Sequence, residues 1–356
     1  MPPTSVNSSK RDAARHRAAE RIRRAAAHRQ PPDEWAQELV GGDRDALSRA
    51  ITLVESRSLE DRPAAEALLE SVGRLEVAAG AVRVGITGIP GVGKSTFIER
   101  FGQTLIQAGH RVAVLAVDPS SQRSHGSLLG DKTRMEHLVR HPHAFVRPSP
   151  AADALGGVNR ATSEAIALCE AAGYDRILVE TVGVGQSETA VREMTDIFLL
   201  LLISGAGDDL QGIKRGIMEM ADAVVVNKAD GAGMEAARRT AQECASALHL
   251  LPPAPHSTPV EVFTASGLEG QGLEAVAEHV DLLERTWLAS GWWAHQRSAQ
   301  RLERFDRQVR ERLLERAVNG AELKALWERL QTQVAHGQIS PYSAANLFVN
   351  NVDSSI

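Results

Sequence analysis

Cysteine is scarce in this chain of 356 residues, which has only Cys169 and Cys244, far apart and outside any C-x-x-C pattern. Clustered cysteines are what zinc sites and dithiol redox motifs require. The two isolated cysteines therefore argue against a cysteine metal site, and they favour a reducing compartment.

Long hydrophobic runs are also lacking. The longest one, Ile197 to Ile203, is far too short to span a bilayer. The start of the chain is rich in arginine and alanine, but it has no apolar signal segment, and Asp12 and Glu20 interrupt it, which is atypical of a transit peptide. We therefore expect a cytoplasmic protein without a membrane partner.

A strong charge of one sign is the third absence. The formal net charge is −5, and the 43% hydrophobic and 24% charged residues are typical of a soluble globular protein. No global basic field therefore favours nucleic acid. The segment Lys10–Arg29 holds eight lysines and arginines against two acids. We interpret it as a solvated helix or tail because no aromatic residues interleave, with a nucleic-acid or acidic-partner arm as the alternative.

What the chain does have is a complete phosphate-loop pattern, G-x-x-x-x-G-K-[ST], at residues 88–96. Alternating apolar residues from Val82 to Ile86 predict a strand before this loop, and apolar residues at helical spacing from Phe97 to Leu105 predict a helix after it. A strand, a glycine turn and a helix start are the setting that a nucleotide triphosphate requires.

Glycines in such a loop let backbone N–H groups converge on phosphate oxygens, and the helix N-terminus adds partial positive charge. Lys94 would reach the β- and γ-phosphates and act in catalysis, and the Ser95 hydroxyl would ligate Mg²⁺. The loop residues predicted to bind the nucleotide are Gly91, Val92, Gly93, Lys94, Ser95 and Thr96.

Strand and helix patterns alternate from Ala81 to about Gly270. Six further apolar runs follow the first strand, at 112–117, 144–146, 177–179, 197–203, 223–226 and 260–263. Nearly continuous apolar runs are typical of strands that are covered on both faces. We therefore predict an α/β fold with a doubly wound, mostly parallel sheet, in which ligand groups gather at the C-terminal ends of the strands.

Acidic residues stand where they could hold a metal ion. Asp118 closes the second strand, Asp131 ends a loop rich in glycine and serine, and Glu180 closes a later strand. We predict that they hold Mg²⁺ directly or through water, and Glu180 would alternatively hold the attacking water. Gly183 can offer a backbone N–H to the γ-phosphate. Gln186 would orient the attacking water, although a surface position is the commoner fate of a glutamine.

The tetrapeptide Asn227-Lys228-Ala229-Asp230 follows another predicted strand. The two carboxylate oxygens of Asp230 match the paired N1–H and N2–H donors of guanine, whereas adenine would leave a buried carboxylate unpaired. Asn227 would brace the loop or meet the acceptor side of guanine, and the stem of Lys228 would pack on the base. This segment predicts a guanine nucleotide.

Two further segments complete the predicted site. A backbone N–H near the guanine O6 is expected from the turn after the final strand, which holds Thr264, Ala265 and Ser266. Lys214 closes a flexible acidic loop that begins at Gly205. Lys214 or the adjacent Arg215 would add positive charge in the transition state, as an arginine finger does, with a plain surface loop as the alternative.

The chain divides into four predicted segments: a disordered or basic helical tail (1–32), an N-terminal helical extension of two or three amphipathic helices (33–80), the nucleotide domain (81–270) and a C-terminal helical arm (271–356). Within the arm, helices are expected to about Gln333 and an irregular stretch from Ile339 to Val352. The arm also holds Trp287, Trp292, Trp293 and Trp327. Packing on the same domain and a subunit interface are both open for them.

These motifs closely resemble those of the methylmalonyl-CoA mutase-associated GTPases, the MeaB/ArgK-type G-protein chaperones, which are P-loop GTPases. The resemblance covers most residues after about 40. Its most specific segments are 88–96, 118–121, 130–135, 180–188 and 209–214.

The resemblance implies a homodimeric GTPase that binds GTP and GDP with Mg²⁺ and docks on an adenosylcobalamin-dependent acyl-CoA mutase. It would gate cofactor loading and protect or reactivate the mutase, and the cobalamin would belong to the partner. Asp118, Asp131 and Glu180 would organise the Mg²⁺ site. The C-terminal helices would form the dimerisation arm, which favours an interface role for the tryptophans. The loops that match the family's switches are 118–134, 180–193 and 204–215.

One departure and two rival classes remain. Ser124-His125-Gly126 stands where the family usually has Thr-Gly-Gly, which leaves open a methylmalonyl-, isobutyryl- or 2-hydroxyisobutyryl-type mutase as partner. A metal-delivery GTPase of a related branch would require a Cys/His cluster, which two isolated cysteines do not supply. A small-molecule kinase or transport ATPase would prefer ATP, and Asp230 argues against that preference.

Overall fold

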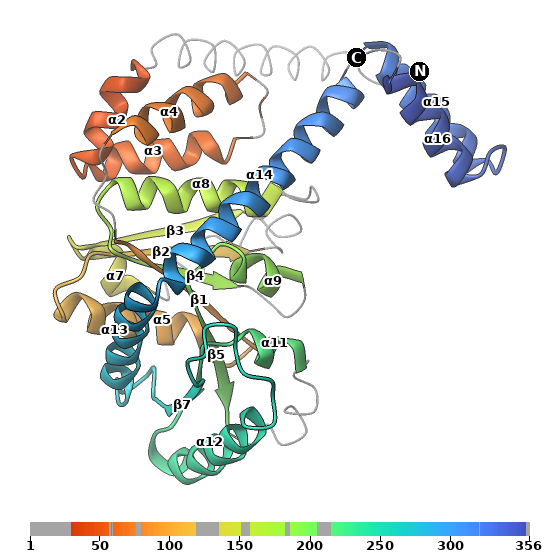
Figure 1. Ribbon diagram of the computed structural model, residues 1–356. Helices are drawn as coiled ribbons and strands as arrows, with labels where there is room; N and C mark the ends of the chain where they lie inside the picture. Colours follow the sequence, from red (N-terminus) through yellow and green to blue (C-terminus); the bar gives the residue numbers. More distant parts are fainter. Residues whose placement is uncertain are drawn as a thin grey trace, which may run out of the picture.

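Seven parallel strands form one sheet at the centre of the protein (Figure 1). The computed structural model describes residues 30–56, 58, 60–75, 80–118, 135–150, 157–181, 186–204, 215–319 and 321–353. The strands are β1 (Val82–Gly88), β2 (Val112–Asp118), β3 (Ala144–Pro150), β4 (Arg176–Thr181), β5 (Ile197–Ile203), β6 (Ala223–Asn227) and β7 (Glu261–Thr264). Each lies where the sequence predicts it to within a few residues, which confirms the α/β fold and its parallel sheet.

The strand order is β3-β2-β4-β1-β5-β6-β7, so β1 lies at the centre. In the register of the sheet, Ile86 of β1 pairs with Glu180 of β4, and Gly88 pairs with Leu201 of β5. Glu180 therefore lies beside the end of β1, where the phosphate loop begins. The loop itself starts at the middle of the sheet, between two strands that support it on either side.

Helices cover both faces of the sheet, as side-chain alternation along a strand requires. The face of Ile197, Leu199 and Leu201 is covered by α5 (Lys94–Gln107), α7 (Glu136–Arg140) and α13 (Leu273–Ser290). The opposite face, with Phe198, Leu200 and Leu202, is covered by α8 (Gly157–Ala171), α9 (Gln186–Arg192), α11 (Arg215–Met220) and α12 (Met234–Leu248).

The N-terminal extension forms three helices, α2 (Pro32–Val40), α3 (Arg44–Val54) and α4 (Arg62–Arg74), within the predicted two or three. The Asp43 carboxylate accepts hydrogen bonds from the backbone N–H groups of Asp45 and Ala46, each at 2.8 Å, and so caps α3. Fully buried Leu47 and Leu68 join the apolar core of α8. The extension is therefore a layer stacked on the sheet domain (Figure 1). The basic segment 10–29 lies outside the described residues.

The tryptophans correct one expectation. Trp287 is fully buried and Trp293 is 8% exposed, and both belong to the core that α5 and α13 share with the sheet. Trp292 packs partly buried against the same core, and Trp327 packs against Phe348 in a separate cluster. The preference for an interface role is thus wrong for Trp287 and Trp293, because α13 and the start of α14 bury them in the core of their own domain.

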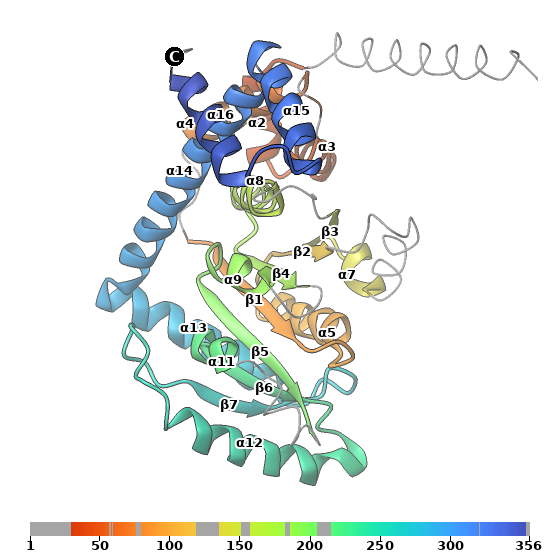
Figure 2. The same ribbon diagram turned by 90° about the vertical axis from the view of Figure 1, so that its right-hand side faces the viewer.

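Three helices end the chain: α14 (Trp292–Asn319), α15 (Ala321–Ala335) and α16 (Pro341–Asp353). The irregular stretch predicted from Ile339 is wrong, because α16 occupies it. Pro341 opens this helix, and the Ser340 hydroxyl accepts a hydrogen bond from the Ser343 N–H at 3.0 Å. Figure 1 shows α14 running past α8 to α15 and α16, which lie apart from the sheet, and in Figure 2 this pair faces the viewer. None of the helices in the described part of the chain is long and apolar enough to cross a membrane.

Candidate nucleotide site

The phosphate loop joins β1 to α5 through backbone conformations that only glycine adopts readily. Gly88 has φ +155°, and a Cβ built there would lie 2.5 Å from the Leu201 carbonyl oxygen. Gly93 has φ +92° and precedes the first residue of α5, Lys94. The loop therefore ends at a helix N-terminus whose N–H groups and dipole can hold phosphate oxygens.

Lys94 lies across the loop that it belongs to. Its Nζ donates to the Gly88 carbonyl oxygen at 2.6 Å and lies 3.4 Å from that of Ile89. Burial lowers the pKa of Lys94 from its usual value, whereas the negative charges of Glu180 and Glu188 act to raise it. A cation held in this way is positioned to exchange its carbonyl partners for phosphate oxygens.

Ser95 and Glu180 come together as predicted. The Ser95 hydroxyl donates to Oε1 of Glu180 at 3.1 Å, and Glu180 is 4% exposed. A hydroxyl and a carboxylate are hard oxygen donors of the kind that Mg²⁺ prefers, so this pair fits the ion. Asp118 ends β2, but its side chain is not among the described ones, and Asp131 lies outside the described residues.

Asn227 ties the predicted base-binding loop to the phosphate loop. Its Nδ2 donates to the Val92 carbonyl oxygen at 2.9 Å, and its Oδ1 accepts from the Gly267 N–H at 3.0 Å. Lys228, at φ +60°, donates from Nζ to the Gly91 carbonyl oxygen at 2.8 Å. The bracing predicted for Asn227 is what the structure shows, and the stem of Lys228 extends over the same loop.

Asp230 is held by the turn after β7. The Ser266 hydroxyl donates to Oδ2 of Asp230 at 2.5 Å. The Ala265 N–H donates to the Val226 carbonyl oxygen, and the Ser266 N–H donates to that of Gln271, both at 2.9 Å. These two N–H groups are thus engaged and do not point to a guanine O6 in this conformation. The turn contributes the Ser266 hydroxyl, which orients the Asp230 carboxylate, and Thr264 ends the strand before it.

The remaining predicted residues divide into two groups. Val92 is fully buried under the loop, and Gly91 and Thr96 are exposed around it. Gly183 and Lys214 lie outside the described residues, and Gln186 begins α9 without a described side chain. Their predicted roles stay predictions.

One residue was missed at the sequence level. Glu188 of α9 is fully buried, and its charge acts on Lys94. Because this buried carboxylate lies close enough to Lys94 to act on its charge, Glu188 is a further candidate residue of the phosphate site. The signal that the sequence offered for Glu188 was an acidic residue in the segment after Glu180. The sequence alone does not show that α9 turns this side chain inward.

Comparisons with known proteins agree with this geometry. A family model described as methylmalonyl Co-A mutase-associated GTPase MeaB matches residues 47–322. A putative GTPase from Caulobacter vibrioides is 52% identical over 315 residues, which are 88% of this chain and 95% of that protein. The mitochondrial methylmalonic aciduria type A homolog of Mus musculus is 46% identical over 319 residues, 87% of this chain and 77% of that protein. A crystal structure described as a LAO/AO transport system kinase has a TM-score of 0.69 and 34% identity, and it covers 90% of this chain and 97% of its own.

Proposed function

Because the chain belongs to the MeaB family of GTPases, as its motifs indicated, we propose that it acts as a G-protein chaperone of an adenosylcobalamin-dependent acyl-CoA mutase. In this role it gates cofactor loading and protects or reactivates the mutase. The description of the family as mutase-associated supports the partner, and the name of the mouse relative is consistent with it. The cobalamin belongs to the mutase and not to this chain.

The observation that carries the proposal is the contact between Ser95 and Glu180 at 3.1 Å. It links the phosphate loop to the end of β4, where the chain leaves the sheet toward α9. Ser95 and Glu180 would hold Mg²⁺, with Asp118 and Asp131 as further ligands, and the ion would neutralise charge on the β- and γ-phosphate oxygens. A change at the γ-phosphate would therefore reach the segment after β4 directly.

The remaining roles follow from the same geometry. Lys94 would leave the Gly88 carbonyl for the phosphates, and Asp230 would accept the two guanine donors while Ser266 orients it. Gln186 would orient the attacking water, and Lys214 would add transition-state charge. A partner that binds one nucleotide state better than the other then reads the nucleotide, and by linkage it changes nucleotide affinity by the same factor.

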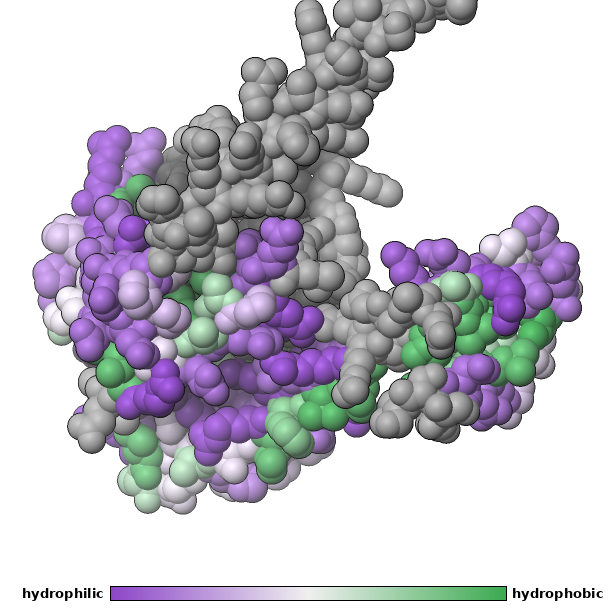
Figure 3. All heavy atoms as spheres, turned by 90° about the horizontal axis from the view of Figure 1, so that it is seen from above, coloured by the Kyte–Doolittle hydropathy of each residue, from purple (hydrophilic) through white to green (hydrophobic). Residues whose placement is uncertain are grey.

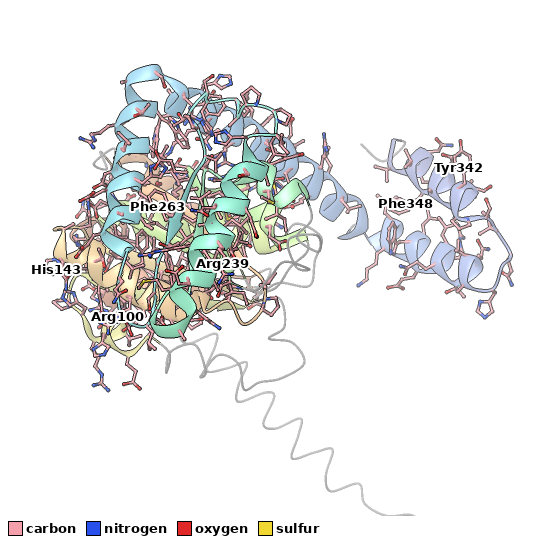
Figure 4. The ribbon with its side chains drawn as sticks, turned by 90° about the horizontal axis from the view of Figure 1, so that it is seen from below. Arg100, His143, Arg239, Phe263, Tyr342 and Phe348 are labelled. Carbon is pink, nitrogen blue, oxygen red and sulfur yellow. The ribbon has the colours of Figure 1, made fainter. Side chains whose placement is uncertain are left out.

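The homodimer is supported by the outer face of α14. Its exposed apolar residues are Leu302, Phe305, Val309 and Leu313, spaced by three or four positions and therefore aligned on one face. An apolar groove of about 750 Å³ continues this face between α14, α15 and α16. Figure 3 shows apolar surface gathered on these helices, and Figure 4 places Tyr342 and Phe348 on the arm, away from Phe263 of the sheet. We propose that a second copy of the chain covers this surface.

The test is co-purification of the full chain with a panel of cobalamin-dependent acyl-CoA mutases, with GTP hydrolysis measured in each mixture. We expect slow hydrolysis by the chain alone and acceleration by one mutase. If the chain hydrolysed no GTP alone or with any of these mutases, the proposal would be overturned.

The likeness to the transport system kinase structure keeps an ATP-dependent kinase as the second candidate, and a preference for ATP would favour it. For the metal-delivery alternative, the described residues hold no group of three or more His, Cys, Asp or Glu that could bind a metal ion.

A further inference from the structure

Beyond Trp293, the inner face of α14 is polar, and it contacts the turn between α9 and β5. Gln296 donates from Nε2 to the Asp196 carbonyl oxygen at 3.0 Å, and Gln300 donates to that of Thr195 at 2.8 Å. The same turn follows the last residue of α9. The arm is therefore attached to the domain at the place where the helix beside the phosphate site ends.

The firmest of these contacts is between Arg297 and Asp196. Arg297 donates from Nε to Oδ1 at 2.8 Å and from Nη2 to Oδ2 at 2.6 Å, a bidentate pair, and Asp196 is fully buried. Asp196 also accepts from the Arg83 N–H of β1 at 2.8 Å. Because Asp196 is tied to the central strand, this pair fixes one point of α14 on the sheet.

A second contact lies further along α14. Arg307 donates to Oε2 of Glu193 at 3.1 Å, and both side chains are 27% exposed. Burial and the charge of Glu303 raise the pKa of Glu193, and Arg307 opposes that change. Glu193 thus stands between an acid and a base on the same helix. If α14 slid so that Glu303 came next to Glu193, the attraction between Glu193 and Arg307 would be replaced by repulsion between two carboxylates. The contact therefore holds α14 in one register against α9.

Beyond Arg307 the helix is loosely attached. A polar gap of about 450 Å³ separates it from α4 and α8, with charged side chains such as Glu70, Arg160 and Glu311 around it. Among the described side chains of α14, the outermost contact with the domain is the pair of Arg312 and Glu66 at 2.7 Å, with 57% and 41% of the two side chains exposed. Exposed pairs contribute little. The far half of α14 can therefore tilt by widening or narrowing this gap.

The other end of the connection is α9. Glu188 is fully buried on this short helix, and its charge acts on Lys94. A bound triphosphate adds negative charge beside Lys94, and Mg²⁺ offsets part of it, so the environment of the Glu188 carboxylate differs between GDP and GTP. When GDP and GTP interact differently with two conformations of a protein, exchanging one nucleotide for the other shifts the equilibrium between these conformations.

We propose that Glu193 and Arg307 transmit the nucleotide-dependent position of α9 to α14, which turns about the Arg297–Asp196 pair and moves α15 and α16. Arg307 lies roughly 15 Å from Arg297 along the helix, and Asn319 lies roughly 33 Å from it, at 1.5 Å per residue. The end of the arm then moves about twice as far as the contact that drives it. This inference rests on the proposed GTP switch, and it names the route from the nucleotide to the arm.

The test measures how close α14 lies to α4. Glu66→Cys and Arg312→Cys are placed in the full chain, and the rate at which a short bismaleimide bridges them is compared with GDP and with a non-hydrolysable GTP analogue. The bridged product is cross-linked within one chain and has the mass of a monomer, so it can be told apart from a cross-link between two copies of the chain. Cys169 and Cys244 are both buried and do not compete.

We expect the bridging rate with GDP to differ from the rate with the GTP analogue. Glu193→Gln or Arg307→Gln should largely abolish this difference between nucleotides. The double variant Glu193→Arg with Arg307→Glu, which exchanges the two charges, should restore the difference. Arg238→Gln removes an exposed pair with Glu235 on α12, 3.3 Å long, and should leave the difference unchanged. Calorimetry of nucleotide binding accompanies each variant. Equal rates with both nucleotides in a chain that binds GTP would overturn the coupling alone. A chain that binds no GTP would overturn the proposed function itself.

Discussion

The nucleotide pocket and the C-terminal arm are built in opposite ways. Beneath the pocket, α5 turns Phe97, Phe101 and Leu105 into the core, and Glu99 is the single polar residue that it buries. In the arm, α14 beyond Trp293 turns Gln296, Arg297 and other polar residues toward the domain and leaves Phe305, 63% exposed, on its outer face. A helix of the first kind stabilises its own domain, whereas a helix of the second kind gains its apolar burial from another molecule.

The difference also appears in the polar contacts. Around the phosphate loop, Lys94, Asn227 and Lys228 each donate to a carbonyl oxygen of the loop within 3.0 Å. Such a site is preorganised for its ligand. On the arm, the contacts weaken from the buried pair at Arg297 to the exposed one at Arg312. We therefore expect changes in the pocket to have large effects and changes along the arm to have small ones on the isolated chain.

The largest effect should come from Asp230→Asn. It removes the charged acceptor of two guanine hydrogen bonds, each of about 1.5–3 kcal/mol, so GTP affinity should fall by about 10²–10⁴-fold. Calorimetry measures this loss. Xanthosine triphosphate is the control, because its base has a carbonyl where guanine has the exocyclic amine, and the Asn amide can donate to it. Unchanged GTP affinity would show that this carboxylate does not read the base.

A matched pair of phenylalanine variants contrasts the two helices directly. Phe101→Ala empties a fully buried position and should lower the free energy of unfolding by about 3–5 kcal/mol. Phe305→Ala should change it by less than about 0.5 kcal/mol in the monomer and should weaken self-association instead. Urea unfolding and sedimentation equilibrium measure the two quantities. A Phe305→Ala variant that associates as strongly as the parent chain would remove the support for the outer face as the interface.

Lys94→Ala should lower the rate constant of GTP hydrolysis by about 10²–10³-fold, the usual cost of losing one preorganised donor to transition-state charge. Single-turnover hydrolysis measures it. Lys324→Ala, at an exposed position of α15, is the matched control and should keep the parent rate. A rate retained within a few-fold in Lys94→Ala would contradict the assignment of this lysine to the phosphates.

The smallest effect belongs to Arg312→Gln at the outer end of α14. The exposed pair with Glu66 should contribute at most about 1 kcal/mol to the free energy of unfolding. Urea unfolding at low and high salt measures it, and salt should reduce the contribution further. If the free energy of unfolding fell by several kcal/mol, the far half of α14 would be firmly packed on the domain, which would contradict the polar gap described between α14 and α4.

Local signals account for what the sequence predicts well. Apolar runs of strand length and the glycine pattern at 88–96 are short-range features, and they place the sheet and the phosphate loop correctly. Strand order then brings Glu180 to Ser95, since ligand groups gather at strand ends. The hydrogen bond from the Ser266 hydroxyl to Asp230 was not predicted, because the sequence analysis expects a backbone N–H of this turn near the guanine O6.

Long-range contacts account for what the sequence does not show. Trp287 appears equally suited to an interface until α13 is seen to fold onto α5. Two ion pairs join residues more than a hundred positions apart in the sequence, Arg297 with Asp196 and Arg307 with Glu193. No local sequence pattern predicts them. The missed helix at α16 is different, because Ser340 followed by Pro341 is a start signal that was present in the sequence.

Calorimetric titration of the full chain with GTP and with ATP, both in the presence of Mg²⁺, measures directly whether the site selects guanine. We expect GTP to bind at least about 100-fold more tightly, because guanine offers Asp230 two N–H donors in addition to the Ser266 hydroxyl, whereas adenine offers an acceptor at N1. Equal affinity for the two nucleotides, or tighter binding of ATP, would contradict this expectation.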